Sequence, residues 1–179
     1  MIVLDEAYNE YLSPEQRCDA IAWVRTHSNL IVSRSFSKAY GLAGLRVGYA
    51  IAQPTLTDLM NRVRQPFNVN SLAQAAAIAA LQDTEFLAKS FAVNRDGKQQ
   101  LQLGFTKLGL TFIPSYSNFV LVKVGDAARV NLELLKRGVI VRPVAGDGLP
   151  EWLRVSIGLP HENQIFLDAL TAIVQADAK

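Results

Sequence analysis

The sequence predicts an α/β protein in which an incomplete sheet is joined by a long helix to a small C-terminal α+β domain. Two short apolar runs at residues 1–4 and 30–32 flank a helical pattern, which is the order of a parallel βαβ pair. A periodic apolar pattern then covers residues 85–108, and short apolar runs follow it. We therefore expect a partial sheet domain (1–84), a connecting helix (85–108) and a small α+β domain (109–179).

The first domain is expected to contain three strands and three helices. Residues 1–8 predict a buried strand that delivers Asp5 and Glu6 at its C-terminal end. Ser13 and Pro14 start a helix that we expect to continue to Arg25, before a second strand. The other expected elements are that strand (30–34), a third strand (45–52), a helix (56–64) and an alanine-rich helix (70–83).

The remaining elements follow a single helix expected over residues 85–108, about six turns long from the helical rise per residue. Three short apolar segments, "NFVLVKV", "GVIVRPV" and "WLRVSIG", predict strands. Helices are expected between them, at residues 129–136, and after them, at residues 162–175. This mixture predicts a compact α+β unit.

Composition excludes several classes of function. Eighteen basic and sixteen acidic residues give a net charge of +2 without a basic block, so we expect no nucleic-acid partner. Cys18 is the single cysteine, and His27 and His161 lie far apart, so neither an internal disulfide nor a metal site is expected. No apolar run approaches the roughly 20 residues of a membrane span, and no leader pattern opens the sequence. We expect a cytoplasmic protein with no membrane association.

The segment "SRSFSKAYGLAGLRVGYA" (33–50) places Lys38 directly after the second strand. Taken alone, a lysine there is typical of a solvated surface. The spacing matches neither G-x-x-x-x-G-K nor G-x-G-x-x-G, so it does not predict a nucleotide site. Two hydroxyls and a guanidinium, those of Ser35, Ser37 and Arg46, are nevertheless a donor set that suits a phosphate dianion.

Asp5 ends the neighbouring strand, so its carboxylate should meet the lysine loop at one edge of the sheet. Pyridoxal 5'-phosphate needs this combination of groups. It offers an aldehyde to a lysine, a phosphate to hydroxyls and arginine, and a ring nitrogen that must stay protonated beside a carboxylate. The residues therefore favour this cofactor.

Five segments resemble, in order, those of the fold-type I pyridoxal-phosphate-dependent aminotransferases, and most closely the histidinol-phosphate aminotransferases within that family. They are "VLDEAYNEY", "SRSFSKAYGLAGLRVGYA", "SNFVLVK", "GVIVRP" and "WLRVSIG". The resemblance implies that Lys38 forms a Schiff base with the cofactor, that Asp5 pairs with the ring nitrogen, and that Tyr8 bonds the ring hydroxyl. It also implies a role in phosphate binding for three residues: Ser35, Ser37 and Arg46.

The same resemblance assigns the substrate side. Arg154 would take the acidic end of the substrate, and Arg142 would be a second anion contact. The implied partners are a small amino donor and a 2-oxo acid such as 2-oxoglutarate. The resemblance also implies a homodimer and a role in histidine biosynthesis.

Only the C-terminal half of such an enzyme is matched. The family's glycine-rich phosphate turn, its aromatic residue stacked on the ring and its N-terminal arm have no counterpart here, so we expect a fragment that is inactive by itself. Three alternatives stay open. They are an aromatic amino-acid aminotransferase, a decarboxylase of a phosphorylated amino acid, and a non-catalytic domain.

Overall fold

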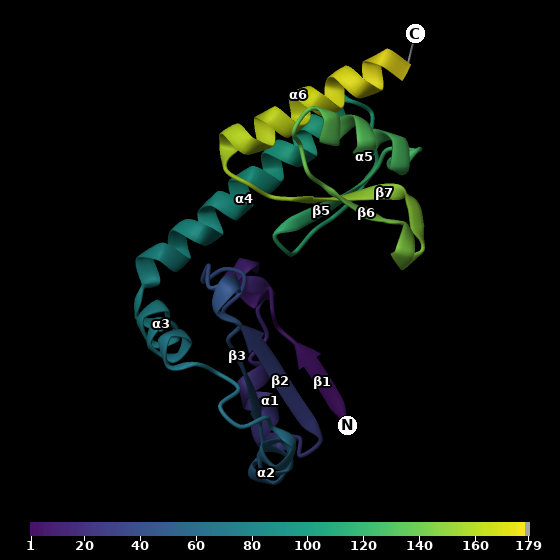
Figure 1. Ribbon diagram of the computed structural model, residues 1–179. Helices are drawn as coiled ribbons and strands as arrows, with labels where there is room; N and C mark the ends of the chain where they lie inside the picture. Colours follow the sequence, from purple (N-terminus) through teal and green to yellow (C-terminus); the bar gives the residue numbers. More distant parts are fainter. Residues whose placement is uncertain (178–179) are drawn as a thin grey trace. The chain divides into compact units, whose positions relative to one another are not determined.

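The computed structural model describes residues 1–177, which fall into two compact units, one of residues 1–91 and one that begins at Ala92 (Figure 1). The boundary falls inside α4 (Thr84–Lys107), a helix of 24 residues. The prediction of one uninterrupted helix is therefore confirmed. The domain limits expected at its two ends stay a prediction.

The first unit is built on a three-stranded sheet in the order β1-β2-β3. Its strands are β1 (Ile2–Asp5), β2 (Leu30–Ser35) and β3 (Gly48–Ala52). β1 runs parallel to β2, with Asp5 opposite Ser33, which confirms the predicted parallel pair. β3 runs antiparallel to β2. The C-terminal ends of β1 and β2 thus lie at one edge of the sheet.

The expected burial of the first strand is wrong. Ile2 and Val3 are 57% and 62% exposed, and Leu4 alone among the apolar side chains of β1 packs against α1 and β2. β1 is an edge strand, so β2 is its only neighbour in the described sheet. An apolar edge strand of this kind is a natural place for another polypeptide segment to pair.

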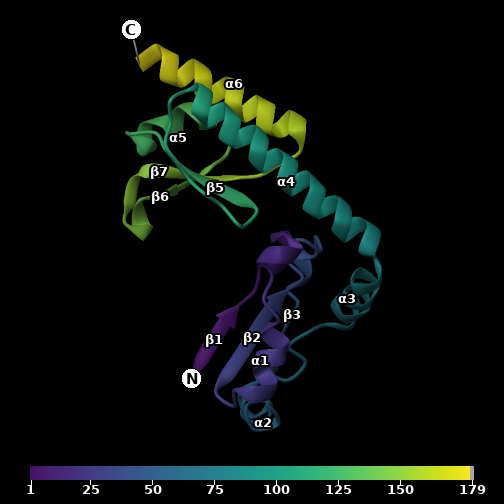
Figure 2. The ribbon, with the colours of Figure 1, turned by 180° about the vertical axis from the view of Figure 1, so that it is seen from behind.

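The first unit also contains helices, which are labelled in Figure 2. They are α1 (Ala20–Thr26), α2 (Pro54–Val63) and α3 (Ser71–Gln82), with short 3₁₀ turns at Asn9–Tyr11, Pro14–Gln16 and Ala43–Leu45. The single helix expected over residues 14–25 is wrong. The Pro14–Gln16 turn ends before α1 begins. Asp19 caps α1, because its Oδ1 accepts a hydrogen bond from the Ala22 amide at 2.9 Å.

The second unit contains an antiparallel sheet in the order β4-β5-β7-β6. The strands are β4 (Phe112–Ile113), β5 (Phe119–Lys123), β6 (Arg142–Val144) and β7 (Leu149–Ser156), and the helices are α5 (Ala127–Lys136) and α6 (Pro160–Asp177). A 3₁₀ turn, Ala145–Asp147, joins β6 to β7. Sequence analysis missed β4, because two residues are too few to show an alternating pattern.

One face of this second sheet carries the core. Alternate residues of the two central strands, such as Val120 and Leu153, are fully buried among the helices. Figure 1 shows α5, α6 and the end of α4 on this side. Phe105 anchors the cluster through ring contacts with Phe112 and Phe166. Over residues 1–177, no helix is both long enough and apolar enough to cross a membrane.

Candidate functional site

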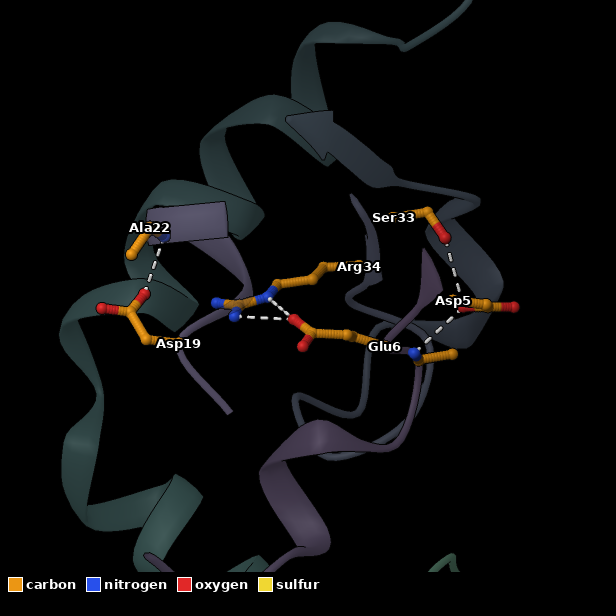
Figure 3. A network of polar contacts seen from close by, with 7 residues as sticks. Asp5, Glu6, Asp19, Ala22, Ser33 and Arg34 are labelled. Carbon is orange, nitrogen blue, oxygen red and sulfur yellow. Dashed lines mark hydrogen bonds and ion pairs between the residues drawn. The ribbon is translucent and has the colours of Figure 1, made fainter. Parts of the chain in front are cut away.

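Asp5 is held at the end of β1 by two hydrogen bonds. The Ser33 hydroxyl donates to Asp5 Oδ1 at 3.2 Å, and the Ala7 amide donates to the same oxygen at 3.0 Å. Figure 3 shows the other carboxylate oxygen pointing away from both partners. These two hydrogen bonds therefore orient the carboxylate. The Asp5 side chain is exposed.

Lys38 and Tyr8 come together at the same edge of the sheet. Lys38 lies three residues beyond the end of β2, and Tyr8 lies three residues beyond the end of β1. The Lys38 ammonium nitrogen is 5.6 Å from the centre of the Tyr8 ring, within the range of a cation–π contact. The parallel pairing of β1 and β2 brings these side chains together although 30 residues separate them in the sequence.

The candidate phosphate donors gather within the loop itself. The Ser37 amide donates to the Ser35 hydroxyl at 3.0 Å, and Arg46 Nη1 donates to the Ser37 hydroxyl at 3.3 Å. Arg46 has a left-handed backbone (φ 52°), which is strained for a residue other than glycine. Its guanidinium also donates to the Ala43 carbonyl at 2.8 Å, which helps to hold the turn in that conformation.

The two substrate candidates form a separate cluster in the second unit. Arg142 and Arg154 stand directly opposite each other on β6 and β7, and Arg154 lies 4.4 Å from the centre of the Phe119 ring. Like charges in directly opposed positions of a sheet repel each other. A bound anion would relieve this repulsion, so the pair is suited to a carboxylate or a phosphate.

Sequence analysis missed a buried ion pair beside the site. Arg34 Nη2 lies 2.8 Å from Glu6 Oε2, and the two side chains are only 18% and 8% exposed. Burial lowers the pKa of Arg34, but hydrogen bonds to Glu6 and Tyr49 outweigh it and raise that pKa. The predicted parallel pairing could have revealed this ion pair, since aligning the two strand ends would have placed Glu6 beside Arg34.

Glu10 is a second buried carboxyl in this region. It is 8% exposed, and its Oε2 has no hydrogen-bond partner among the described residues. Burial raises its pKa, against the attraction of Arg34 and Arg17.

The donor set at the sheet edge fits pyridoxal 5'-phosphate chemically. It combines an amine, an oriented carboxylate, a phenol, and two hydroxyls linked to a guanidinium. No group of three His, Cys, Asp or Glu side chains that could hold a metal ion occurs in the described part of the chain. A cavity of about 970 Å³ is also present in the first unit, and apolar side chains such as Phe36, Phe67 and Ile78 line it.

The chain matches the family described as "Aminotransferase class I and II" over residues 1–170. It is 66% identical to histidinol-phosphate aminotransferase 2 of Ralstonia nicotianae, over 99% of this chain and 49% of that protein. The chain thus spans about half the length of the curated relatives it matches.

Two solved structures are similar over nearly the whole chain. A putative histidinol-phosphate aminotransferase from Erwinia carotovora atroseptica has a TM-score of 0.91 at 30% identity, covering 99% of this chain and 51% of that one. The enzyme of that name from Sinorhizobium meliloti, in complex with pyridoxal-5'-phosphate, has a TM-score of 0.84 at 32% identity, covering 97% and 48%. Both comparisons identify the fold as a mixed α/β portion of an aminotransferase.

Proposed function

The chain belongs to the class I and II aminotransferase family, and from that premise we propose that it is the C-terminal portion of a histidinol-phosphate aminotransferase. One observation of the structure supports this most strongly. The parallel pairing of β1 and β2 gathers Asp5, Tyr8 and Lys38 at one edge of a sheet. An amine, a carboxylate and a phenol are the side chains that this chemistry requires.

Lys38 would have two tasks. Its amine would hold the cofactor covalently, and after release by the substrate amine it would move a proton at the substrate α-carbon. Pyridoxal phosphate, when bound, supplies an aldehyde and an electron-accepting ring. Asp5 would accept a hydrogen bond from the protonated ring nitrogen, and Tyr8 would bond the ring hydroxyl.

Anion binding would be divided between two groups of residues. The loop hydroxyls of Ser35 and Ser37, with the Arg46 guanidinium, would hold the cofactor phosphate. Arg154 would hold the acidic group of the substrate, because its guanidinium is already oriented by the Phe119 ring. Arg142, exposed on the neighbouring strand, would be the weaker contact.

The whole enzyme would exchange an amino group between a small amino donor and a 2-oxo acid such as 2-oxoglutarate. We expect it to be a cytoplasmic homodimer. The identity of 66% to a histidinol-phosphate aminotransferase supports this substrate class over an aromatic amino acid or a decarboxylase substrate. This chain by itself is expected to be inactive, since about half of its relatives' length has no counterpart in it.

A substrate comparison tests the proposal. The complete protein that carries this segment, loaded with pyridoxal phosphate, should transfer the amino group of histidinol phosphate to 2-oxoglutarate faster than that of phenylalanine. Release of carbon dioxide from a phosphorylated amino acid, without amino transfer, would contradict the aminotransferase assignment. Comparable turnover by the 179-residue chain alone would contradict the expectation that it is an incomplete enzyme.

A further inference from the structure

The Glu6–Arg34 ion pair lies on the opposite side of the sheet from Asp5 and Ser33. Successive residues of a strand point to opposite faces, and Figure 3 shows Asp5 and Glu6 pointing in opposite directions. The Glu6 amide still donates to the Ser33 carbonyl at 2.9 Å, so the strand pairing continues to this residue. Arg34 Nε and Nη2 both reach Glu6 Oε2, at 2.9 and 2.8 Å. The end of β1 is thus tied to β2 through both faces.

Contacts on β3 extend this pair toward the lysine loop. Tyr49 stands directly opposite Arg34 in the sheet. The Tyr49 ring centre lies 5.7 Å from that of Phe36, a buried residue two positions before Lys38. The ion pair, the pairing of β2 with β3 and this ring contact therefore link the end of β1 to the residues that carry Lys38.

Burying the Glu6–Arg34 ion pair costs desolvation free energy, so the pair is expected to serve a purpose besides stability. Two desolvated charges often contribute less to stability than a well-packed apolar pair of similar size would. A second carboxyl, that of Glu10, is also buried in this part of the first unit. On the face away from Asp5, the Glu6–Arg34 pair is a side-chain link between the end of β1 and β2, and the apolar side chains of β1 are largely exposed.

We propose, on the basis of the proposed function, that Glu6 and Arg34 are positioning residues that fix the end of β1 relative to the lysine loop. The pair holds Asp5 and Tyr8 at the distance from Lys38 at which one cofactor can engage all three. Lysine cannot replace Arg34 in this role, because a single ammonium cannot reproduce the two guanidinium nitrogens that meet Glu6 Oε2. Displacements of about 1 Å at such sites are enough to reduce catalysis strongly.

The test uses the complete protein and a matched control pair. Arg62 and Asp58 repeat the geometry of two guanidinium nitrogens on one carboxylate oxygen, at 3.0 and 2.6 Å, but on the surface of α2. The variants are Glu6→Gln and Arg34→Lys, with Asp58→Asn as the exposed-pair control. Val24→Ala serves as a stability control, since it removes core volume from α1 without touching the pair. The readouts are the dissociation constant for pyridoxal phosphate, the pH midpoint of the bound cofactor's visible absorbance, and the thermal midpoint.

Glu6→Gln and Arg34→Lys should weaken cofactor binding about tenfold or more and shift the pH midpoint, as misplaced Asp5 and Lys38 would. Both control variants should bind within about twofold of wild type. The proposal is overturned if Glu6→Gln keeps the wild-type affinity and pH midpoint, or loses no more affinity than Val24→Ala at an equal thermal midpoint. It is also overturned if neither variant folds, because the pair is then purely structural. A wild-type protein that binds no cofactor would instead contradict the proposed function.

Discussion

The two units of the molecule differ in how they use their apolar residues. In the second unit, fourteen buried residues pack into one cluster, and Leu101, Phe105 and Leu153 among them are fully buried. The first unit has two separate buried clusters of four residues each and leaves large side chains such as Phe67 and Leu72 at 98% and 77% exposure. The candidate catalytic residues belong to the unit with the smaller cores. The unit that carries the candidate cofactor residues is thus the one with the less extensive packing.

The largest expected difference between the two units is the loss of amino transfer when a lysine of each is replaced. Replacing Lys38 with alanine in the complete protein should reduce amino transfer by about 10⁴-fold, because the covalent attachment and the proton carrier are both lost. Single-turnover kinetics with histidinol phosphate measure this effect. The control is Lys98→Ala in the second unit. Lys98 is also partly buried, burial lowers its pKa, and its amine donates to the Ser115 carbonyl at 3.0 Å.

Lys98→Ala should retain amino transfer within a few-fold of wild type. Full activity in Lys38→Ala, or a comparable loss in both variants, would show that the first unit does not carry the essential amine.

The packing contrast predicts unequal costs for the same substitution. Leu101→Ala, in the second unit, should lower the free energy of unfolding by about 2–5 kcal/mol, because a fully buried side chain leaves a cavity. Leu72→Ala, on the exposed face of α3, should change it by no more than about 0.5 kcal/mol. Urea titration of the 179-residue chain measures both. Equal costs would mean that the exposed face of α3 is covered in solution.

Sequence reasoning captured the parts of the molecule that depend on local pattern. The parallel pair of strands, the long helix and the lysine loop follow from short-range periodicity and motif spacing. It did not find the Glu6–Arg34 pair, since those residues are 28 positions apart and meet only once the strand register is set. The break before α1 was missed because Asp19 caps a new helix inside a run that helical periodicity alone would continue. The exposure of β1 depends on which segments lie beside it, and local sequence does not carry that information.

The second unit should contribute one effect on substrate binding. Arg154→Lys should raise the Michaelis constant for histidinol phosphate about tenfold, because a lysine cannot reproduce the directional contact of a guanidinium with an anion. Arg142→Lys, at the opposed and exposed position, should raise it less. Steady-state kinetics on both variants measure this difference. If neither constant changes, the substrate anion is bound elsewhere and the second unit has no direct role in the chemistry.

The smallest expected effect is a pH dependence that originates in the first unit. Burial raises the pKa of Glu10 above its ordinary value of 4.5, so the folded state favours the protonated form. The contribution of Glu10 to the free energy of unfolding is fully present below pH 4.5. It is lost as the pH rises through the higher pKa that Glu10 has in the folded state. Glu10→Gln should therefore unfold with a weaker pH dependence than wild type across this range. Thermal unfolding measured at a series of pH values checks this, and identical curves would contradict it.

Chemical labelling tests the central assignment most directly. The complete protein is incubated with pyridoxal phosphate, reduced with borohydride, digested, and analysed by mass spectrometry to locate the cofactor. We expect the label on the peptide that contains Lys38, and no label above background on Lys98. A label that maps to another lysine, or none at all in a protein that transfers amino groups, would contradict the assignment of the sheet edge in the first unit as the active site.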